Sequence, residues 1–81
     1  MRLVLVEWVD SYGCSPSWTE IAEPLAPKML ACRSVGWLAH DGADCKVLIP
    51  HVADAEGARQ GCGDMTIPVR AIVSIRDLTP P

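Results

Sequence analysis

The residues best suited to covalent or metal chemistry are four cysteines and two histidines. They are Cys14, Cys32, Cys45, Cys62, His40 and His51. Structural zinc sites usually draw their ligands in pairs about two to four residues apart, and no Cys-x-x-Cys occurs in this chain. His40 and Cys45 flank an expected turn, and Cys45 and His51 share an expected strand face. These two pairs are therefore the alternative candidates for metal ligands. We expect reduced thiols, no metal site and no cofactor.

Cys62 has the setting of a candidate nucleophile, because Gly61 and Gly63 flank it and Asp64 follows. A reactive thiol needs a positive neighbour that lowers its pKa, and Asp64 has the opposite effect. A chain of 81 residues also has little room for a pocket that excludes water. The sequence therefore predicts a protein that is not an enzyme.

The same glycines raise a second question, in the stretch from Gln60 to Pro68, QGCGDMTIP. Backbone amides in a glycine-rich turn can hold an anion, yet this stretch lacks the helix and lysine of a phosphate-binding loop. The simpler interpretation is a turn in which Gly61 and Gly63 adopt positive φ and Asp64 caps the turn. The turn interpretation gives these residues a structural role, whereas Gly61, Gly63 and Asp64 are candidate binding residues if the stretch contacts a ligand or a partner.

Composition limits the class of protein. The 81 residues are predicted to form one domain, residues 1–81, with a thin core. Because 49% of the residues are apolar, we expect self-association to cover surface that the core leaves open. The net charge is −3 and the seven basic residues are scattered, so we expect no binding to nucleic acid. Neither a signal peptide nor a membrane-spanning apolar run is recognised, which favours a cytoplasmic protein without a membrane partner.

The elements that would position these residues are short strands. Residues 2–10 predict a first strand, RLVLVEWVD, whose two faces are both mostly apolar. Such a strand is either central in a curled barrel or has one face against a partner chain. Residues 10–28 contain three prolines and predict a long loop. A helical turn from Ser17 or Thr19, with Glu20 completing a capping box, is an alternative inside this loop.

The clearest unit is a hairpin over residues 28–52, because Asp41-Gly42 separates two apolar runs. Gly36 predicts a bulge or a close approach of another backbone, and Pro50 predicts an edge strand or a strand end. Residues 53–64 predict an exposed loop. A short strand at 66–67, a tight turn at 68–70 and a last strand at 71–75 follow, and 79–81 predict a frayed terminus. The sum is an all-β chain with five strands and a long first loop, which favours a small barrel or roll.

The ending MTIPVRAIVSI, residues 65–75, resembles the end of an SH3-like barrel. In that fold a strand ends at an Ile-Pro, a single 3₁₀ turn follows, and a last strand pairs back to the first. The resemblance covers most of the chain as a pattern, and it implies a small five-stranded SH3-like barrel or roll with a long first loop. Peptide-binding members read proline-rich ligands with aromatic residues, which Tyr12 and Trp18 would supply here. The Ala-Leu-Tyr-Asp-Tyr start and the paired tryptophans of those members are missing.

The whole chain also resembles short proteins encoded by bacteriophages, through three short matches. These are Trp8 with Asp10 and Ser11, then residues 34–37, then residues 61–68. The resemblance implies an accessory protein that acts in the cytoplasm of an infected bacterium. We therefore expect a module that masks a host protein through the long first loop and the neighbouring glycine-rich loop. Defence and regulatory proteins are the candidate targets, and Tyr12 and Trp18 are the anchors.

Two other functions stay open at this point. One is a homo-oligomer that sequesters a small ligand, such as a signalling nucleotide, at subunit interfaces. Arg33, Arg59 and Arg70 would meet phosphates there, and residues 61–63 would contribute amides. The other is a minor structural protein of the virion.

Overall fold

The computed structural model describes residues 1–78 and contains strands joined by loops and one 3₁₀ turn. In chain order the elements are β1 (Arg2–Ser11), β2 (Met29–Asp41), β3 (Cys45–Ile49), β4 (His51–Ala55), β5 (Ala58–Cys62), β6 (Met65–Pro68), the 3₁₀ turn η1 (Val69–Ala71) and β7 (Ile72–Asp77). The prediction of an all-β chain is confirmed. The frayed terminus predicted for residues 79–81 lies outside the described residues.

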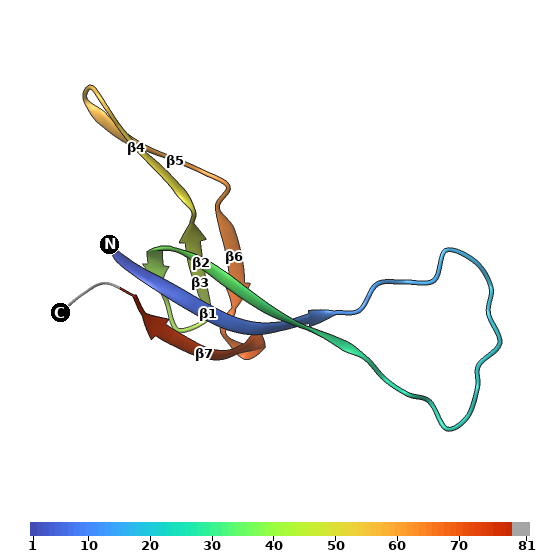
Figure 1. The fold of residues 1–81 in the computed structure, drawn as a ribbon. Helices are drawn as coiled ribbons and strands as arrows, with labels where there is room; N and C mark the ends of the chain where they lie inside the picture. Colours follow the sequence, from blue (N-terminus) through green and yellow to red (C-terminus); the bar gives the residue numbers. More distant parts are fainter. Residues whose placement is uncertain (79–81) are drawn as a thin grey trace.

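Five of the strands form one antiparallel sheet, in the order β6-β3-β2-β1-β7 (Figure 1). β1 pairs with β2 along its whole length, from Arg2 opposite Leu38 to Ser11 opposite Met29. On its other side β1 pairs with β7. The first strand is therefore an interior strand, with a hydrogen-bonded neighbour on each side, as one of the two sequence interpretations required.

The β2–β3 hairpin turns at Asp41-Gly42, as the sequence predicts. The Gly42 amide donates to the Cys45 carbonyl oxygen at 3.1 Å, and the Lys46 ammonium donates to the Gly42 carbonyl oxygen at 2.8 Å. Lys46 also donates to the Asp41 carboxylate. This hydrogen bond, together with the positive charge of Lys46, holds the pKa of Asp41 below its usual range. Lys46 thus ties the two sides of the turn together.

Gly36 and Pro50 also act as the sequence predicts. A Cβ atom added at Gly36 would lie 3.2 Å from the Ile49 carbonyl oxygen, so glycine permits a close backbone approach. The irregularity in the β2–β3 ladder lies further along β2, between Leu38 and His40. Pro50 follows the last residue of β3, because proline has no amide hydrogen with which to continue the ladder.

The loop predicted for residues 53–64 is wrong, because these residues form most of a second hairpin. β4 and β5 pair from His51 opposite Cys62 to Ala55 opposite Ala58, and Gly57 takes a φ of +81° at the turn. We call this two-stranded unit the arm, residues 51–62; it stands away from the main sheet (Figure 1). Its strands bury almost no side chain. Their sequence therefore lacks the alternation of apolar and polar residues that would predict a strand. Backbone hydrogen bonds and the glycine turn form the arm instead.

The helical turn considered for Ser17 or Thr19 does not form. Residues 12–28 contain only bends, and the Ser15 hydroxyl donates to the Ser17 carbonyl oxygen at 2.9 Å. No hydrogen bond of the Glu20 side chain occurs within the described residues, so the capping box is absent there. Prolines at 16, 24 and 27 remove amide donors that a helix would need.

The core lies on one face of the curled sheet and is small. Its buried side chains are Val4, Val6, Leu38, Leu48 and Ile67. Partly buried side chains pack around them, among them Trp8, whose indole nitrogen donates to the Ser34 hydroxyl at 3.0 Å. The five-stranded sheet is open, because its edge strands β6 and β7 do not pair with each other. Five buried side chains therefore carry the apolar packing of the whole sheet.

Leu48 offers a direct test of this core. Leu48 is 2% exposed, so Leu48→Ala leaves a cavity and should lower the free energy of unfolding by about 2–5 kcal/mol. Leu25→Ala, at a position that is 68% exposed, is the matched control and should change stability by less than about 0.5 kcal/mol. Urea denaturation followed by tryptophan fluorescence measures both values. Equal stabilities for the two variants would contradict this assignment of the core.

Candidate functional site

The most exposed apolar segment is the loop of residues 12–28, which we call the first loop. It extends from the end of the paired strands β1 and β2, well clear of the sheet (Figure 1). Every residue in it is exposed, and Trp18 is 102% exposed. The Lys28 ammonium lies 5.4 Å from the centre of the Tyr12 ring, a cation–π contact across the base of the loop. Tyr12, Trp18 and Ile21 therefore do not pack the loop onto itself.

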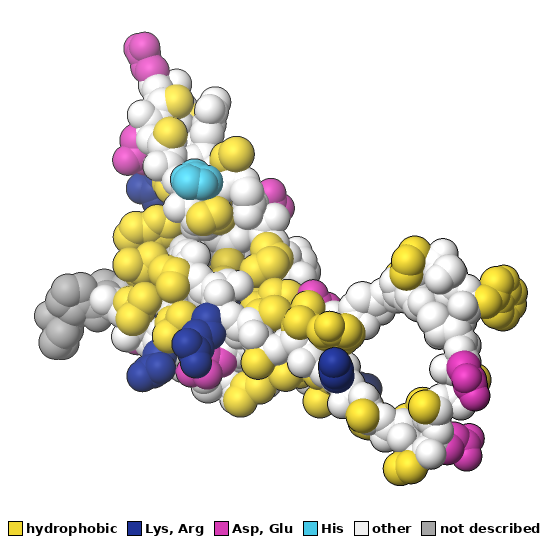
Figure 2. Space-filling view, turned by 45° about the vertical axis from the view of Figure 1, so that its right-hand side comes forward, with side chains coloured by type: hydrophobic (Ala, Val, Ile, Leu, Met, Phe, Trp, Pro, Cys, Tyr) yellow, Lys and Arg dark blue, Asp and Glu magenta, His cyan; other side chains and the backbone are white. Residues whose placement is uncertain are grey.

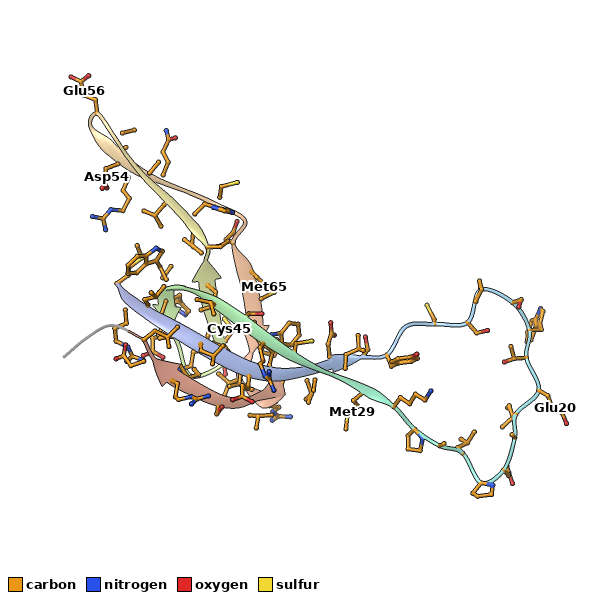
Figure 3. The ribbon with its side chains drawn as sticks, in the orientation of Figure 1. Glu20, Met29, Cys45, Asp54, Glu56 and Met65 are labelled. Carbon is orange, nitrogen blue, oxygen red and sulfur yellow. The ribbon has the colours of Figure 1, made fainter. Side chains whose placement is uncertain are left out.

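The first loop gives the molecule an elongated shape. The radius of gyration is 17.0 Å, whereas a compact chain of this length has about 12 Å. Figure 3 shows Met29 at the base of the loop, where β2 begins, and Glu20 at its far side. Glu20 and Glu23 are the charged residues between Tyr12 and Pro27, so the loop is apolar and weakly acidic.

The candidate binding residues lie in three places. Tyr12 and Trp18 are on the first loop, Arg33 is on β2, and the remaining four are at the arm or just after it. Those four are Arg59, Gly61, Gly63 and Asp64. The first loop and the glycine-rich stretch, expected as neighbours, lie apart, because the loop projects beyond the sheet and the stretch runs from the arm into β6 (Figure 1). A contact surface made of both segments in one chain is therefore not formed.

The glycine-rich stretch QGCGDMTIP forms the junction between the arm and β6. Gly63 has a φ of +79°, as the turn interpretation requires. Gly61 does not have positive φ; a Cβ atom there would lie 2.9 Å from Cγ2 of Ile49, so close packing explains this glycine. Within residues 1–78 the Asp64 carboxylate makes no hydrogen bond, so the predicted cap is absent from this part. The geometry supports the turn interpretation of the stretch.

The arginines of the small-ligand hypothesis are also separated. Arg33 is on β2, Arg70 is in η1, and Arg59 on β5 donates to the Asp54 carboxylate at 3.0 Å. Arg33 and Arg59 line different hollows of the surface, and Gly61 lines one together with Arg59. Phosphate binding by all three arginines would therefore need groups from more than one chain.

The cysteines are free thiols. Cys14 and Cys62 are exposed, while Cys32 and Cys45 are partly buried. Among the described residues no group of three or more His, Cys, Asp or Glu side chains is placed to hold a metal ion. No helix in residues 1–78 is long and apolar enough to cross a membrane.

A second surface, which sequence reasoning did not assign to a site, is the side of the sheet away from the core. We call it the outer face and define it by alternate residues of the two longest strands. These are Leu3, Leu5, Glu7 and Val9 on β1, and Trp37, Val35, Arg33 and Ala31 on β2. They alternate with the core residues of the same strands, such as Val4 and Val6. The two apolar faces of residues 2–10 were the signal that pointed to this surface.

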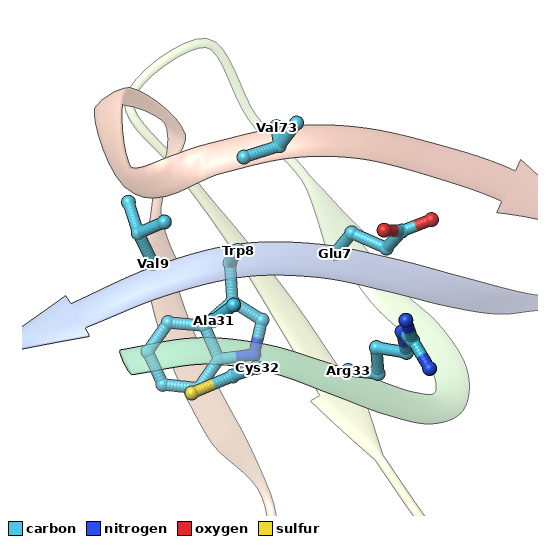
Figure 4. Close-up of a pocket in the computed structure, with 7 residues that line it drawn as sticks. All are labelled: Glu7, Trp8, Val9, Ala31, Cys32, Arg33 and Val73. Carbon is cyan, nitrogen blue, oxygen red and sulfur yellow. The ribbon is translucent and has the colours of Figure 1, made fainter. Parts of the chain in front are cut away.

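The outer face is hollowed at the end where Val9 lies. An open hollow of about 580 Å³ is lined there by both charged residues of the face, Glu7 and Arg33, and by Val9, Ala31 and Val73; Trp8 and Cys32, from the other side of the same strands, complete the lining (Figure 4). Arg76 on β7 donates to the Glu7 carboxylate at 3.4 Å. Val35, next to Arg33 on this face, is 52% exposed, and Val73 is 70% exposed. Figure 2 shows apolar side chains gathered over the sheet and at several points of the first loop.

Comparisons of this chain with protein-family models, with curated proteins and with solved structures find no match.

Gly63 and Gly57 provide a matched pair for testing the turn at the arm. Both have φ near +80°, so alanine is strained at each by about 1–2 kcal/mol. A Cβ atom at Gly63 would also lie 3.0 Å from Cγ of Pro50, whereas Gly57 has open space. Gly63→Ala should therefore lower the midpoint of urea unfolding further than Gly57→Ala does. Equal midpoints would mean that the contact with Pro50 does not define the junction.

Proposed function

We propose that this chain is a non-catalytic binding module that masks the surface of another protein, with the first loop as its contact. The observation that carries the proposal is the exposure of the large apolar side chains of this loop. Tyr12, Trp18, Ile21 and Leu25 are between 56% and 102% exposed. Apolar surface that the fold of its own chain leaves in water is a common sign of a protein interface.

The loop also has the chemistry of a docking segment. Tryptophan and tyrosine are enriched among the residues that dominate binding energies at interfaces. Pro16, Pro24 and Pro27 restrict the conformations of the free loop, which lowers the entropy lost when a partner orders it. Glu20 and Glu23 favour a partner surface on which basic residues surround an apolar pocket.

For the fold, we propose a small SH3-like roll. The 3₁₀ turn η1 follows Pro68, and β7 then pairs back to β1, which are the features that the resemblance named. The resemblance to short phage proteins supports a role in the cytoplasm of an infected bacterium, where the masked partner is a host protein with a defence or regulatory task. Tyr12 and Trp18 are the anchors in this proposal.

Masking is preferred over the two other functions on one ground. The arginines that would hold a nucleotide lie on separate elements of the chain, whereas Tyr12, Trp18, Ile21 and Leu25 are exposed on a single loop. The described residues show no feature that favours a structural role in the virion more strongly than the exposed first loop favours masking.

The test is capture of a partner from bacterial lysate by the tagged protein, with identification by mass spectrometry. We expect one host protein to bind the unaltered chain. Trp18→Ala should weaken its binding by about 30-fold or more, because loss of a central tryptophan commonly costs at least about 2 kcal/mol. Glu56→Ala, which removes an exposed side chain at the turn of the arm, away from the first loop, is the control and should bind normally.

Circular dichroism spectra should be the same for all three proteins, because neither position belongs to the core. If Trp18→Ala captures the same protein with unchanged affinity, the first loop is not the contact. If a calorimetric titration instead shows stoichiometric binding of a nucleotide, sequestration replaces masking.

A further inference from the structure

The chain exposes more surface than its mass requires. Its accessible surface is 6649 Å², whereas a compact monomer of 8.7 kDa exposes about 4,700 Å². The excess is about 1,900 Å², and a stable interface buries about 800 Å² on each partner. One interface on the first loop and a second on another surface therefore fit within this excess. The outer face of the sheet is the candidate for the second.

The outer face has a pattern that is complementary to itself. Its residues on β1 and β2 stand directly opposite one another across the ladder: Leu3 opposite Trp37, Leu5 opposite Val35, Glu7 opposite Arg33 and Val9 opposite Ala31. Every apolar residue on one strand is thus level with an apolar residue on the other, and the acid is level with the base. A surface with this arrangement matches its own copy under one particular rotation.

That rotation is a two-fold axis parallel to the strands, lying over the gap between β1 and β2. It sets β1 of one copy over β2 of the other without shifting the rows. Glu7 then faces Arg33 of the partner subunit, and Leu5 faces Val35 of the partner subunit. Sheets stack about 10 Å apart with their strands nearly aligned, so the proposed geometry is an ordinary one for packed sheets. An axis in the plane of the face but perpendicular to the strands would set Glu7 over Glu7 of the partner subunit and is disfavoured.

We propose that the outer face is a homodimer interface built on this axis, with two Glu7–Arg33 pairs between the subunits at its centre. The apolar rows on either side supply the affinity. The ion pairs fix the register, because a slip by one row would leave buried charges without partners. Arg76, one strand further from the axis, lies at the rim and continues to pair with Glu7 of its own chain.

The axis has a consequence for the whole assembly. A rotation about a line parallel to the strands keeps the strand direction, so both first loops project from the same end of the dimer. Two Trp18 side chains would then be presented to one partner or to two neighbouring partners, which raises the effective affinity. The dimer itself does not rest on the proposed masking function and is tested without any host protein.

The first experiment is sedimentation equilibrium of the purified chain and of two variants. The unaltered protein should sediment as a dimer, with twice the 8.7 kDa mass of the chain. Val35→Arg puts a third charge on the outer face, and we expect it to raise the dimer dissociation constant at least about 100-fold. Ala43→Arg places the same charge in the exposed β2–β3 turn and should remain dimeric.

The decisive experiment uses two charge reversals. Glu7→Arg places two arginines, and Arg33→Glu two glutamates, at positions 7 and 33, which face each other across the proposed axis, so each variant alone should be monomeric. Mixed in equal amounts, they should form a heterodimer. The introduced arginine of one chain then faces the introduced glutamate of the other, and the unaltered Arg33 of the first chain faces the unaltered Glu7 of the second. Native mass spectrometry distinguishes this heterodimer from the two monomers by mass.

Three results would overturn the proposal. The first is a monomeric unaltered chain at every soluble concentration, and the second is a Val35→Arg variant that is still a dimer. The third is a mixture of the two charge-reversed variants, each folded by circular dichroism, that stays monomeric. If either reversed variant fails to fold, the Val35→Arg and Ala43→Arg pair decides the question alone.

Discussion

The antiparallel ladder between β1 and β2 is the interaction on which the rest of the structure depends. Its pairs run without a break from Arg2 opposite Leu38 to Ser11 opposite Met29. β7 attaches to one side of this ladder and β3 to the other. On one face the ladder contributes Val4, Val6 and Leu38 to the core, and at its end it carries the first loop away from the sheet. Its opposite face is the outer face, so one ladder positions both proposed contact surfaces.

Because the core is small, much apolar surface remains available for contacts with other molecules. Among the described residues five apolar side chains are buried, in a chain in which 49% of the residues are apolar. Many of the remaining apolar side chains lie on the outer face and on the first loop, where burial by another molecule gains about 25 cal/mol for each Å² removed from water. An acid and a base stand together at the centre of the outer face, and the loop carries two acids. The two surfaces therefore differ in charge and suit different partners.

The sequence predicted the elements whose residues have strong local preferences. Asp41-Gly42 specified the turn of the hairpin, Gly36 the close backbone approach, and Pro50 the end of β3. The arm was missed because backbone hydrogen bonds, and not buried side chains, hold β4 and β5 together. Gly61 was predicted to have positive φ, whereas its need for glycine comes from Ile49, a contact that only the folded chain creates.

The candidate contact surfaces, too, could be predicted from the sequence only in part. Trp18 could be picked out from its proline-rich surroundings, but whether it packs inward or stands in water depends on where β1 and β2 end. The two apolar faces of residues 2–10 left two interpretations open: a strand central in a curled barrel, or a strand with one face against a partner chain. The outer face corresponds to the second interpretation. Pairing Glu7 with Arg33 required the register of the ladder, which no local sequence pattern specifies.

An isotope-filtered nuclear Overhauser experiment on a mixture of labelled and unlabelled chains would show whether the outer faces of two chains meet. This experiment detects only contacts between different molecules. We expect contacts between the Leu5 methyl groups of one chain and the Val35 methyl groups of another. A dimer without this contact, or one whose intermolecular contacts lie only in the first loop, would contradict the proposed interface.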